Sequence, residues 1–231
     1  MKLRIKYTKT GVLRFIGHLD MMRLFQKAIR RAKLDVAYSK GFSPHQIISF
    51  AAPMPLGMTS EGEYFDGEFE SVPPKQEMIE RLNQTLPDGV RVLDVVKLPE
   101  TAKPSMALVS ASDYLIYTNE EGNPDCLKSL ESHLEAFKEL SNVEIMKKTK
   151  TKEEPVNIRP SIYQLALRED GIYMLLASGS KDNLKPELVV EAMCQTAGIA
   201  YNRYDYRIHR LETYMGGPDH LQSLLETGES W

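Results

Sequence analysis

The order of apolar patterns in the first part of the chain constrains the fold most strongly. Leu3, Ile5 and Tyr7 alternate with basic residues, which is the period of a strand with one buried face and one basic face. An apolar stripe at three- and four-residue steps follows it and predicts an amphipathic helix. Residues 12–15 are expected to extend or pair with the first strand. The order is strand, helix, strand, strand, helix, strand, over residues 2–9, 17–33, 47–51, 61–70, 73–86 and 90–98.

The second half of the chain suggests the same order of elements. Glu169-Asp170-Gly171 between two apolar runs indicates a hairpin, and a helix is expected over 186–197. We therefore predict an α+β protein of two tandem ferredoxin-like (βαββαβ) units with antiparallel sheets. The duplication rests on element order, because the two halves share no residue-level repeat. The expected division is a domain over 1–100, a domain over 105–215 and a polar tail over 216–231.

Composition excludes several classes of protein. No apolar run approaches the ~20 residues that cross a bilayer, and the first residues lack the apolar core of a signal peptide. Cys126 and Cys194 stand far apart, so the sequence predicts neither a disulfide framework nor a CxxC metal site. We expect a cytoplasmic protein with no membrane partner, no metal and no cofactor.

Charge is unevenly distributed along the chain. Residues 1–58 contain 11 lysines and arginines against Asp20 and Asp35, a net charge of +9, whereas the whole chain carries −3. A basic segment in a mildly acidic protein suggests an anionic partner. The alternative is that acidic elements of the same protein neutralise these cations.

The basic segment combines cations with aromatic residues. A helix with several arginines precedes a Gly-, Ser- and Pro-containing loop over 39–44. Cationic side chains can follow a phosphate backbone, and aromatic side chains can stack on unpaired bases. The competing interpretations are a solvated helix face and a phenylalanine that plugs the loop into the core. The candidate nucleic-acid or anion-binding residues are Gly17, His18, Arg23, Lys27, Arg30, Arg31, Tyr38, Lys40, Phe42, His45 and Arg159.

His18 and Asp20 are also candidates for catalysis. A histidine at a helix start can act as a general acid or base, or bind phosphate when protonated. The alternative is that both residues cap the helix and form local hydrogen bonds. A second basic loop, with Lys147, Lys148 and Lys150 among its cations, is either an arm over a nucleic acid or a solvated loop.

A series of short motifs runs through most of the chain: Phe15-x-Gly17-His18-Leu19-Asp20, Arg30-Arg31-Ala32, Tyr38-Ser39-x-Gly41-Phe42-x-Pro44-His45, Ile48-Ser49-Phe50, Pro55-Leu56-Gly57, Glu61-x-Glu63-Tyr64, Asn157-x-Arg159-Pro160 and Lys185-Pro186. This series resembles the radical-SAM-linked domain of unknown function, a family found alone or fused to the C-terminal end of radical SAM proteins. The resemblance implies an accessory or substrate-presenting module with a radical SAM protein as partner. Two cysteines cannot supply the three-cysteine cluster of a radical SAM catalyst, and Asn157 stands where the family suggests an aspartate.

Three functions remain open at this point. The first is a non-catalytic module that binds RNA, such as tRNA or rRNA, through the basic helix and the aromatic loop. The second is a protein-interaction module that docks on a radical SAM enzyme without nucleic acid. The third is an RNA-processing or RNA-modifying enzyme that uses His18 as general acid or base.

Overall fold

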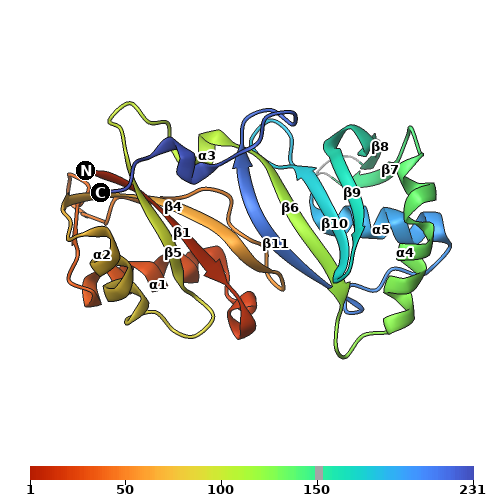
Figure 1. Ribbon diagram of the computed structural model, residues 1–231, viewed down its shortest axis with the longest axis horizontal. Coiled ribbons are helices and arrows are strands. Elements are labelled where there is room, and N and C mark those ends of the chain that lie inside the picture. The colour runs from red at the N-terminus through yellow and green to blue at the C-terminus, as the bar shows by residue number, and fades with distance from the viewer. Residues whose placement is uncertain (149–152) are drawn as a thin grey trace. The chain divides into compact units, whose positions relative to one another are not determined.

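The computed structural model describes residues 1–148 and 153–231, which form two compact units (Figure 1). Unit 1 comprises residues 1–109 and 212–231, and unit 2 comprises residues 110–211. These limits differ from the predicted ones, because the last 20 residues return to unit 1 and do not form a separate tail. Among the described residues, no helix is both long and apolar enough to span a bilayer.

Unit 1 contains an antiparallel sheet in which β1 lies between β5 and β4. The short strands β2 and β3 also pair with β4. Helices α1 and α2 pack beside this sheet (Figure 1). Its elements are β1 (Lys2–Lys9), a 3-10 helix η1 (Gly11–Phe15), α1 (His18–Arg31), β2 (Asp35–Val36), β3 (Ile48–Phe50), β4 (Thr59–Ser71), α2 (Lys75–Asn83), β5 (Val92–Leu98), α3 (Ser105–Leu108), β12 (Gln222–Ser223) and a 3-10 helix η3 (Leu224–Thr227).

The core of unit 1 forms between the apolar face of β1 and the buried side of α1. Tyr7 and Phe25 have ring centroids 4.7 Å apart, and Phe25 lies at the same distance from Phe65. Phe50 packs against Phe65 at 5.4 Å. Such tilted and edge-on pairs stabilise beyond their buried area. This cluster fixes one side of α1 toward the sheet and leaves its polar side outward.

The other face of β1 is covered by the C-terminal segment. Arg4 is fully buried there, and its guanidinium donates to both carboxylate oxygens of Asp66 at 2.8 and 3.0 Å. The same guanidinium donates to the Leu224 carbonyl, the Thr227 hydroxyl and the Lys103 carbonyl. A buried arginine needs this full set of acceptors, because an unpaired buried charge is strongly destabilising.

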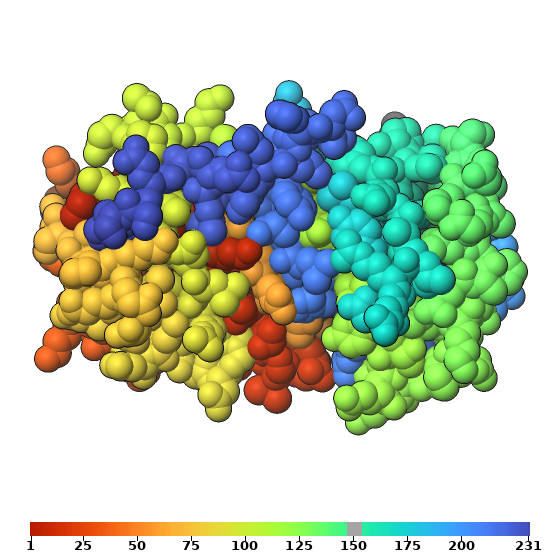
Figure 2. Space-filling model, viewed as in Figure 1, coloured from red at the N-terminus to blue at the C-terminus, as the bar shows by residue number. Residues whose placement is uncertain are grey.

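The end of the chain lies on unit 1 along a surface formed by residues far away in the sequence. Lys97 and Glu229 exchange backbone hydrogen bonds, and the indole of Trp231 donates to the Pro73 carbonyl at 3.2 Å. Figure 2 shows these last residues, in dark blue, over the yellow atoms of unit 1. The predicted polar tail is therefore an ordered part of the unit.

Unit 2 has the strand order β11-β6-β10-β9 and a separate two-stranded sheet, β7-β8. β9 and β10 pair antiparallel across Glu169 and Asp170, which confirms the predicted hairpin. Its elements are β6 (Val109–Thr118), α4 (Pro124–Lys138), β7 (Glu144–Lys148), β8 (Glu153–Asn157), a 3-10 helix η2 (Arg159–Ser161), β9 (Ile162–Arg168), β10 (Gly171–Ala177), α5 (Pro186–Ala197) and β11 (Tyr206–Met215).

The α+β class is confirmed, with five α-helices among the described residues and mostly antiparallel pairing. The tandem ferredoxin-like assignment stays a prediction. The expected strand over residues 12–15 is wrong: η1 occupies this stretch, beginning at Gly11 with a φ of 57° that turns the chain out of the extended conformation. The second predicted basic loop falls partly outside the described residues, which exclude Lys150 and Lys152.

Candidate nucleic-acid interface

The strand β1 does not present the basic face that its alternation predicts. Arg4 is buried against Asp66, and Lys6 forms an ion pair with Glu212 at 2.6 Å. Both acidic partners come from the negatively charged remainder of the chain. Internal neutralisation therefore explains part of the charge asymmetry, and the cations of α1 and the following loop account for the exposed part.

The outward side of α1 carries four exposed cations. Arg23, Lys27 and Arg31 recur every four residues, so they form one row along the helix. Arg30 is also exposed and lies beside this row. Within the described part of the chain, neither Lys27 nor Arg31 makes an ion pair or a hydrogen bond through its side chain. These two charges are available to an external anion.

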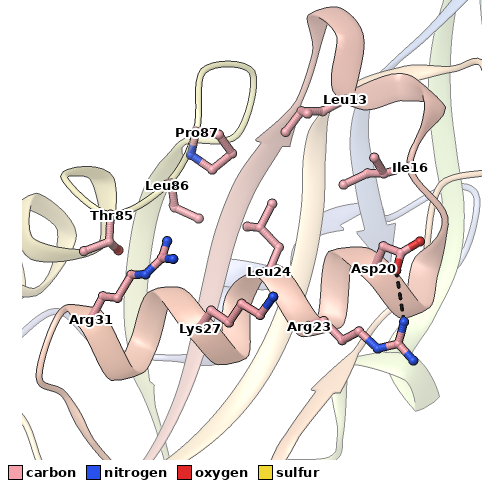
Figure 3. Close-up of a pocket in the computed structure, with 10 residues that line it drawn as sticks. All are labelled: Leu13, Ile16, Asp20, Arg23, Leu24, Lys27, Arg31, Thr85, Leu86 and Pro87. Carbon is pink, nitrogen blue, oxygen red and sulfur yellow. Dashed lines mark hydrogen bonds and ion pairs between the residues drawn. The ribbon is translucent and has the colours of Figure 1, made fainter.

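The cationic row borders a groove of about 680 Å³ (Figure 3). One wall is α1, and the other walls come from η1 and the turn between α2 and β5. The floor of the groove and the wall opposite α1 are apolar. Leu24 points away from α1 toward this opposite wall, and Arg31 reaches toward the turn between α2 and β5 (Figure 3). The lining residues are Leu13, Ile16, Asp20, Arg23, Leu24, Lys27, Arg31, Thr85, Leu86 and Pro87.

Two hydrogen bonds between distant segments hold the groove walls in place. The Thr85 hydroxyl lies 3.2 Å from the Ala28 carbonyl of α1 and 2.9 Å from the Leu82 carbonyl of α2, so its single proton is shared between the two helices. The Thr10 amide donates to the Gly89 carbonyl at 2.7 Å, which brings η1 to the same turn. Gly89 has a φ of 92°, and a Cβ there would come within 2.6 Å of the Thr10 carbonyl oxygen. The close approach of these two turns therefore needs glycine at this position.

Asp20 lies on the groove and pairs with Arg23 at 3.2 Å, with both side chains more than 60% exposed. An exposed pair of this kind contributes about 0–1 kcal/mol. Arg23 can exchange this partner for a ligand anion with little loss. Asp20 bonds locally to Arg23. The N-cap of α1 is Gly17, without a side-chain cap, so the capping role expected of His18 and Asp20 is wrong.

The aromatic loop projects from unit 1 next to α1. Ser39 and His45 close it, through a backbone hydrogen bond of 2.8 Å and a side-chain hydrogen bond of 2.8 Å. The side chain of Gln46 donates to the Gln26 carbonyl of α1 at 3.2 Å and fixes the loop on the helix. Phe42 is fully exposed at the loop tip. The interpretation that Phe42 plugs into the core is therefore wrong.

The remaining loop candidates are solvent-accessible as well. Tyr38 is 49% exposed, and Lys40 and His45 are exposed. Gln26, whose carbonyl holds the loop, precedes Arg30 by four residues and so lies on the same side of α1. The hydrogen bond from Gln46 thus places the base of the loop against the part of α1 that carries Gln26 and Arg30.

His18 begins α1, and Gly17 is its N-cap with no side-chain cap. The imidazole lies edge-on to Phe50 at 5.3 Å. The adjoining cavity, which Tyr7, Lys9 and Glu63 also line, has a volume of about 10 Å³. A cavity of this size holds about one water molecule. His18 is otherwise exposed to solvent, so this cavity does not enclose a substrate beside the imidazole.

Arg159 belongs to unit 2 and serves its local structure. Its guanidinium donates to the carbonyls of Leu140, Ile162 and Lys138 at 3.1, 2.9 and 3.3 Å. Two of these carbonyls, Lys138 and Leu140, lie at and just beyond the C-terminus of α4, where a cation is favourable. The geometry favours a structural role over the predicted anion contact.

The two cysteines do not supply a reactive thiolate. Burial raises the pKa of the Cys126 thiol, and the nearby Asp205 raises it further. Burial also raises the pKa of the Cys194 thiol. Both groups therefore favour the neutral thiol, whereas nucleophilic cysteines have lowered pKa values. Among the described residues, no cluster of His, Cys, Asp or Glu side chains could hold a metal ion.

The sequence did not reveal the second wall of the groove. The sequence predicted Thr85, Leu86 and Pro87 only as the end of a helix, and Leu13 as a strand residue; it assigned no element to Ile16. The turn dipeptides Thr10-Gly11 and Asp88-Gly89 were visible signals. Nothing in the sequence indicates that these two turns meet.

The family described as "Uncharacterized protein conserved in bacteria (DUF2344)" matches residues 2–186. The chain belongs to this family. No curated protein matches the chain significantly. Among solved structures, a chain of a crystal structure of a Cbf5-Nop10-Gar1 complex has a TM-score of 0.44 and 8% sequence identity, over 91% of the DUF2344 chain and 48% of that chain. Likeness at this level carries no functional argument.

Proposed function

We propose that the protein is a non-catalytic RNA-binding module and that α1 and the aromatic loop form its RNA-binding surface. The observation that carries the proposal is the row of Arg23, Lys27 and Arg31 along a groove, with Lys27 and Arg31 free of internal partners within the described chain. Arg30 extends the same cationic face. The proposed ligand is a structured RNA such as tRNA or rRNA.

Electrostatics supports this proposal. Phosphate contacts from lysine and arginine supply most of the non-specific affinity for nucleic acid. The charges that remain exposed in the basic segment are concentrated on α1 and its loop, because Arg4 and Lys6 are neutralised internally. Because the whole chain carries a net charge of −3, we expect RNA to bind where the exposed cations are concentrated, at this surface.

The exposed ring of Phe42 supports RNA over a small inorganic anion. An apolar ring at the tip of a loop is unfavourable in water and gains from a flat partner. Bases that are not paired offer such a partner, and stacking contributes roughly 1–3 kcal/mol per base. Gln46 fixes the loop on α1. We therefore expect the Phe42 ring and the cations of α1 to contact the same RNA.

The surroundings of His18 favour binding over catalysis. The imidazole is exposed, and the cavity beside it, of about 10 Å³, is too small to enclose and orient a reacting group. For this reason we keep the RNA-modifying enzyme only as an outcome that a test can reveal.

The partner is part of the proposal. The sequence motifs around Gly17–Asp20 and Tyr38–His45 support a radical SAM protein as the enzyme that the module serves in the cytoplasm.

We also propose the ferredoxin-like topology for both units. The strand order β5-β1-β4, with β2 and β3 beyond β4, supports it in unit 1. The order β11-β6-β10-β9 supports it in unit 2.

A filter-binding assay with total tRNA at low salt tests the function. We expect retention of tRNA by the wild-type protein. Freshly purified protein with a raised ratio of absorbance at 260 to 280 nm would agree with this. Absence of retention at low salt would contradict the proposal and favour a protein-docking module. RNA that is cleaved or altered in the assay would instead identify an enzyme.

Replacing Phe42 with alanine should weaken binding of single-stranded RNA by roughly tenfold, because one stacking contact is lost. Stability should not change, since the ring makes no buried contact. Fluorescence anisotropy with a labelled oligonucleotide measures the affinity, and thermal unfolding measures the stability. Tyr204→Ala is the matched control, because it removes an exposed ring from unit 2. Equal affinities of Phe42→Ala and wild type would exclude the ring from the surface.

A further inference from the structure

The groove beside α1 has two walls of different chemistry. Arg23, Lys27 and Arg31 form its cationic edge, and Leu24 and Leu86 belong to its apolar floor and far wall. Phosphate groups need only the cations. Both leucines pack against the core of unit 1 and stay partly exposed. An apolar wall that is partly open to solvent suggests that the natural occupant also has an apolar or aromatic part.

We infer that this groove holds an unpaired nucleotide of the bound RNA. The base packs against Leu24 and Leu86, and the neighbouring phosphates follow the cationic row. The inference rests on the proposed RNA binding and gives its substrate class: RNA with at least one accessible single-stranded nucleotide. Flipped or unpaired bases are commonly held between apolar side chains.

The dimensions of the groove fit this occupant. Residues four apart on a helix are about 6 Å apart along its axis, comparable to the distance between neighbouring phosphates of an extended strand. Arg23, Lys27 and Arg31 can therefore contact successive phosphates. The groove volume of about 680 Å³ lies within the range of pockets that enclose a compact ligand. A single nucleotide fits this volume better than a long helix of a partner protein.

A duplex cannot use the apolar wall. Base faces in a duplex are stacked on each other, and only base edges and the backbone reach a protein. Electrostatics alone favours the duplex, since its charge density is higher and its salt slope per contact is larger. A preference for the single strand must therefore come from contacts with the base.

The test compares the affinities of the full-length protein for two RNAs at one salt concentration. The probes are a labelled oligoadenylate of about 12 nucleotides and the duplex that it forms with oligouridylate. We expect the wild type to prefer the single strand. In Leu24→Asn the ratio of duplex to single-strand dissociation constants should fall by roughly tenfold, as one base contact is lost. Leu19→Asn is the control, because Leu19 is exposed on the same helix and does not line the groove.

The duplex affinity shows whether each variant is folded, since it depends on the cations alone. If Leu24→Asn no longer binds the duplex, the test uses Leu86→Asn, in the opposite wall, in its place. Equal binding of both RNAs by the wild type, or an unchanged ratio in the folded groove variants, overturns the inference and leaves RNA binding intact. No binding of either RNA overturns both proposals, and an acidic amphipathic peptide that binds instead would identify a protein-docking groove.

Discussion

Reversing two charges on α1, as Lys27→Glu with Arg31→Glu, is expected to reduce tRNA affinity on the order of 100-fold while the protein stays folded. Both side chains are exposed, and within the described chain neither has an ion-pair partner. The substitutions therefore break no ion pair or side-chain hydrogen bond, and the loss of a cation in the last turn of α1 costs roughly 0.3–1 kcal/mol of stability. Glutamate is also a good helix former, so the helix itself should persist.

The magnitude follows from elementary electrostatics. A contact between unit charges at about 4 Å contributes about 1 kcal/mol in water, and reversal replaces this attraction with a repulsion of similar size. Two reversals thus change the binding free energy by up to about 4 kcal/mol before salt screening, which lowers the effect at physiological ionic strength. Filter binding with tRNA at a fixed salt concentration measures the loss.

The matched control is Lys128→Glu with Lys181→Glu. This pair makes the same change in net charge on exposed side chains of unit 2. We expect it to alter tRNA affinity less than threefold, because these lysines do not belong to the proposed surface and the effect of net charge alone is screened by salt. Similar losses in both double variants would show that the protein responds only to net charge and has no defined surface on α1.

Replacing Asp66 with alanine is expected to lower the free energy of unfolding by about 3–5 kcal/mol. Asp66 accepts two hydrogen bonds from the fully buried Arg4 and a third from the Ser105 amide at 2.6 Å. Its removal leaves an arginine charge inside the protein without its counter-ion. A large part of the stability of a small unit can be lost in this way.

Urea unfolding followed by circular dichroism measures this effect. The control is Glu77→Ala, which breaks the exposed ion pair of Glu77 with Arg81 on α2 and should change stability by less than about 1 kcal/mol. The double variant Arg4→Met with Asp66→Leu should be more stable than Asp66→Ala, because it removes both charges together. A small effect of Asp66→Ala, similar to that of Glu77→Ala, would contradict the burial of an essential ion pair.

The sequence predicted the elements that depend on local patterns. The three- and four-residue spacing of Met22, Phe25, Ile29 and Ala32 placed α1 and identified its cationic side, because helix geometry separates the two faces. The loop that exposes Phe42 was visible in its glycine, serine and proline content. The hairpin at Glu169-Asp170-Gly171 followed from turn chemistry.

Features that join distant parts of the chain were not predictable. Arg4 alternates with apolar residues, which predicts an exposed strand residue. In the structure, residues 222–231 cover it. That return is stabilised by single contacts, such as the indole of Trp231 on the Pro73 carbonyl, which leave no periodic pattern. The apolar wall of the groove also depends on a contact between distant segments, because Thr85 lies beside the Ala28 carbonyl of α1, 57 positions away in the sequence.

The salt dependence of tRNA binding tests the central claim most directly. Each phosphate contact contributes about 0.7–0.9 to the slope of log affinity against log salt. If Lys27 and Arg31 each contact a phosphate, the variant Lys27→Ala with Arg31→Ala should have a slope shallower than the wild type by about 1.4–1.8. Identical slopes for wild type and variant would show that these side chains do not contact the RNA, and would contradict the proposed surface.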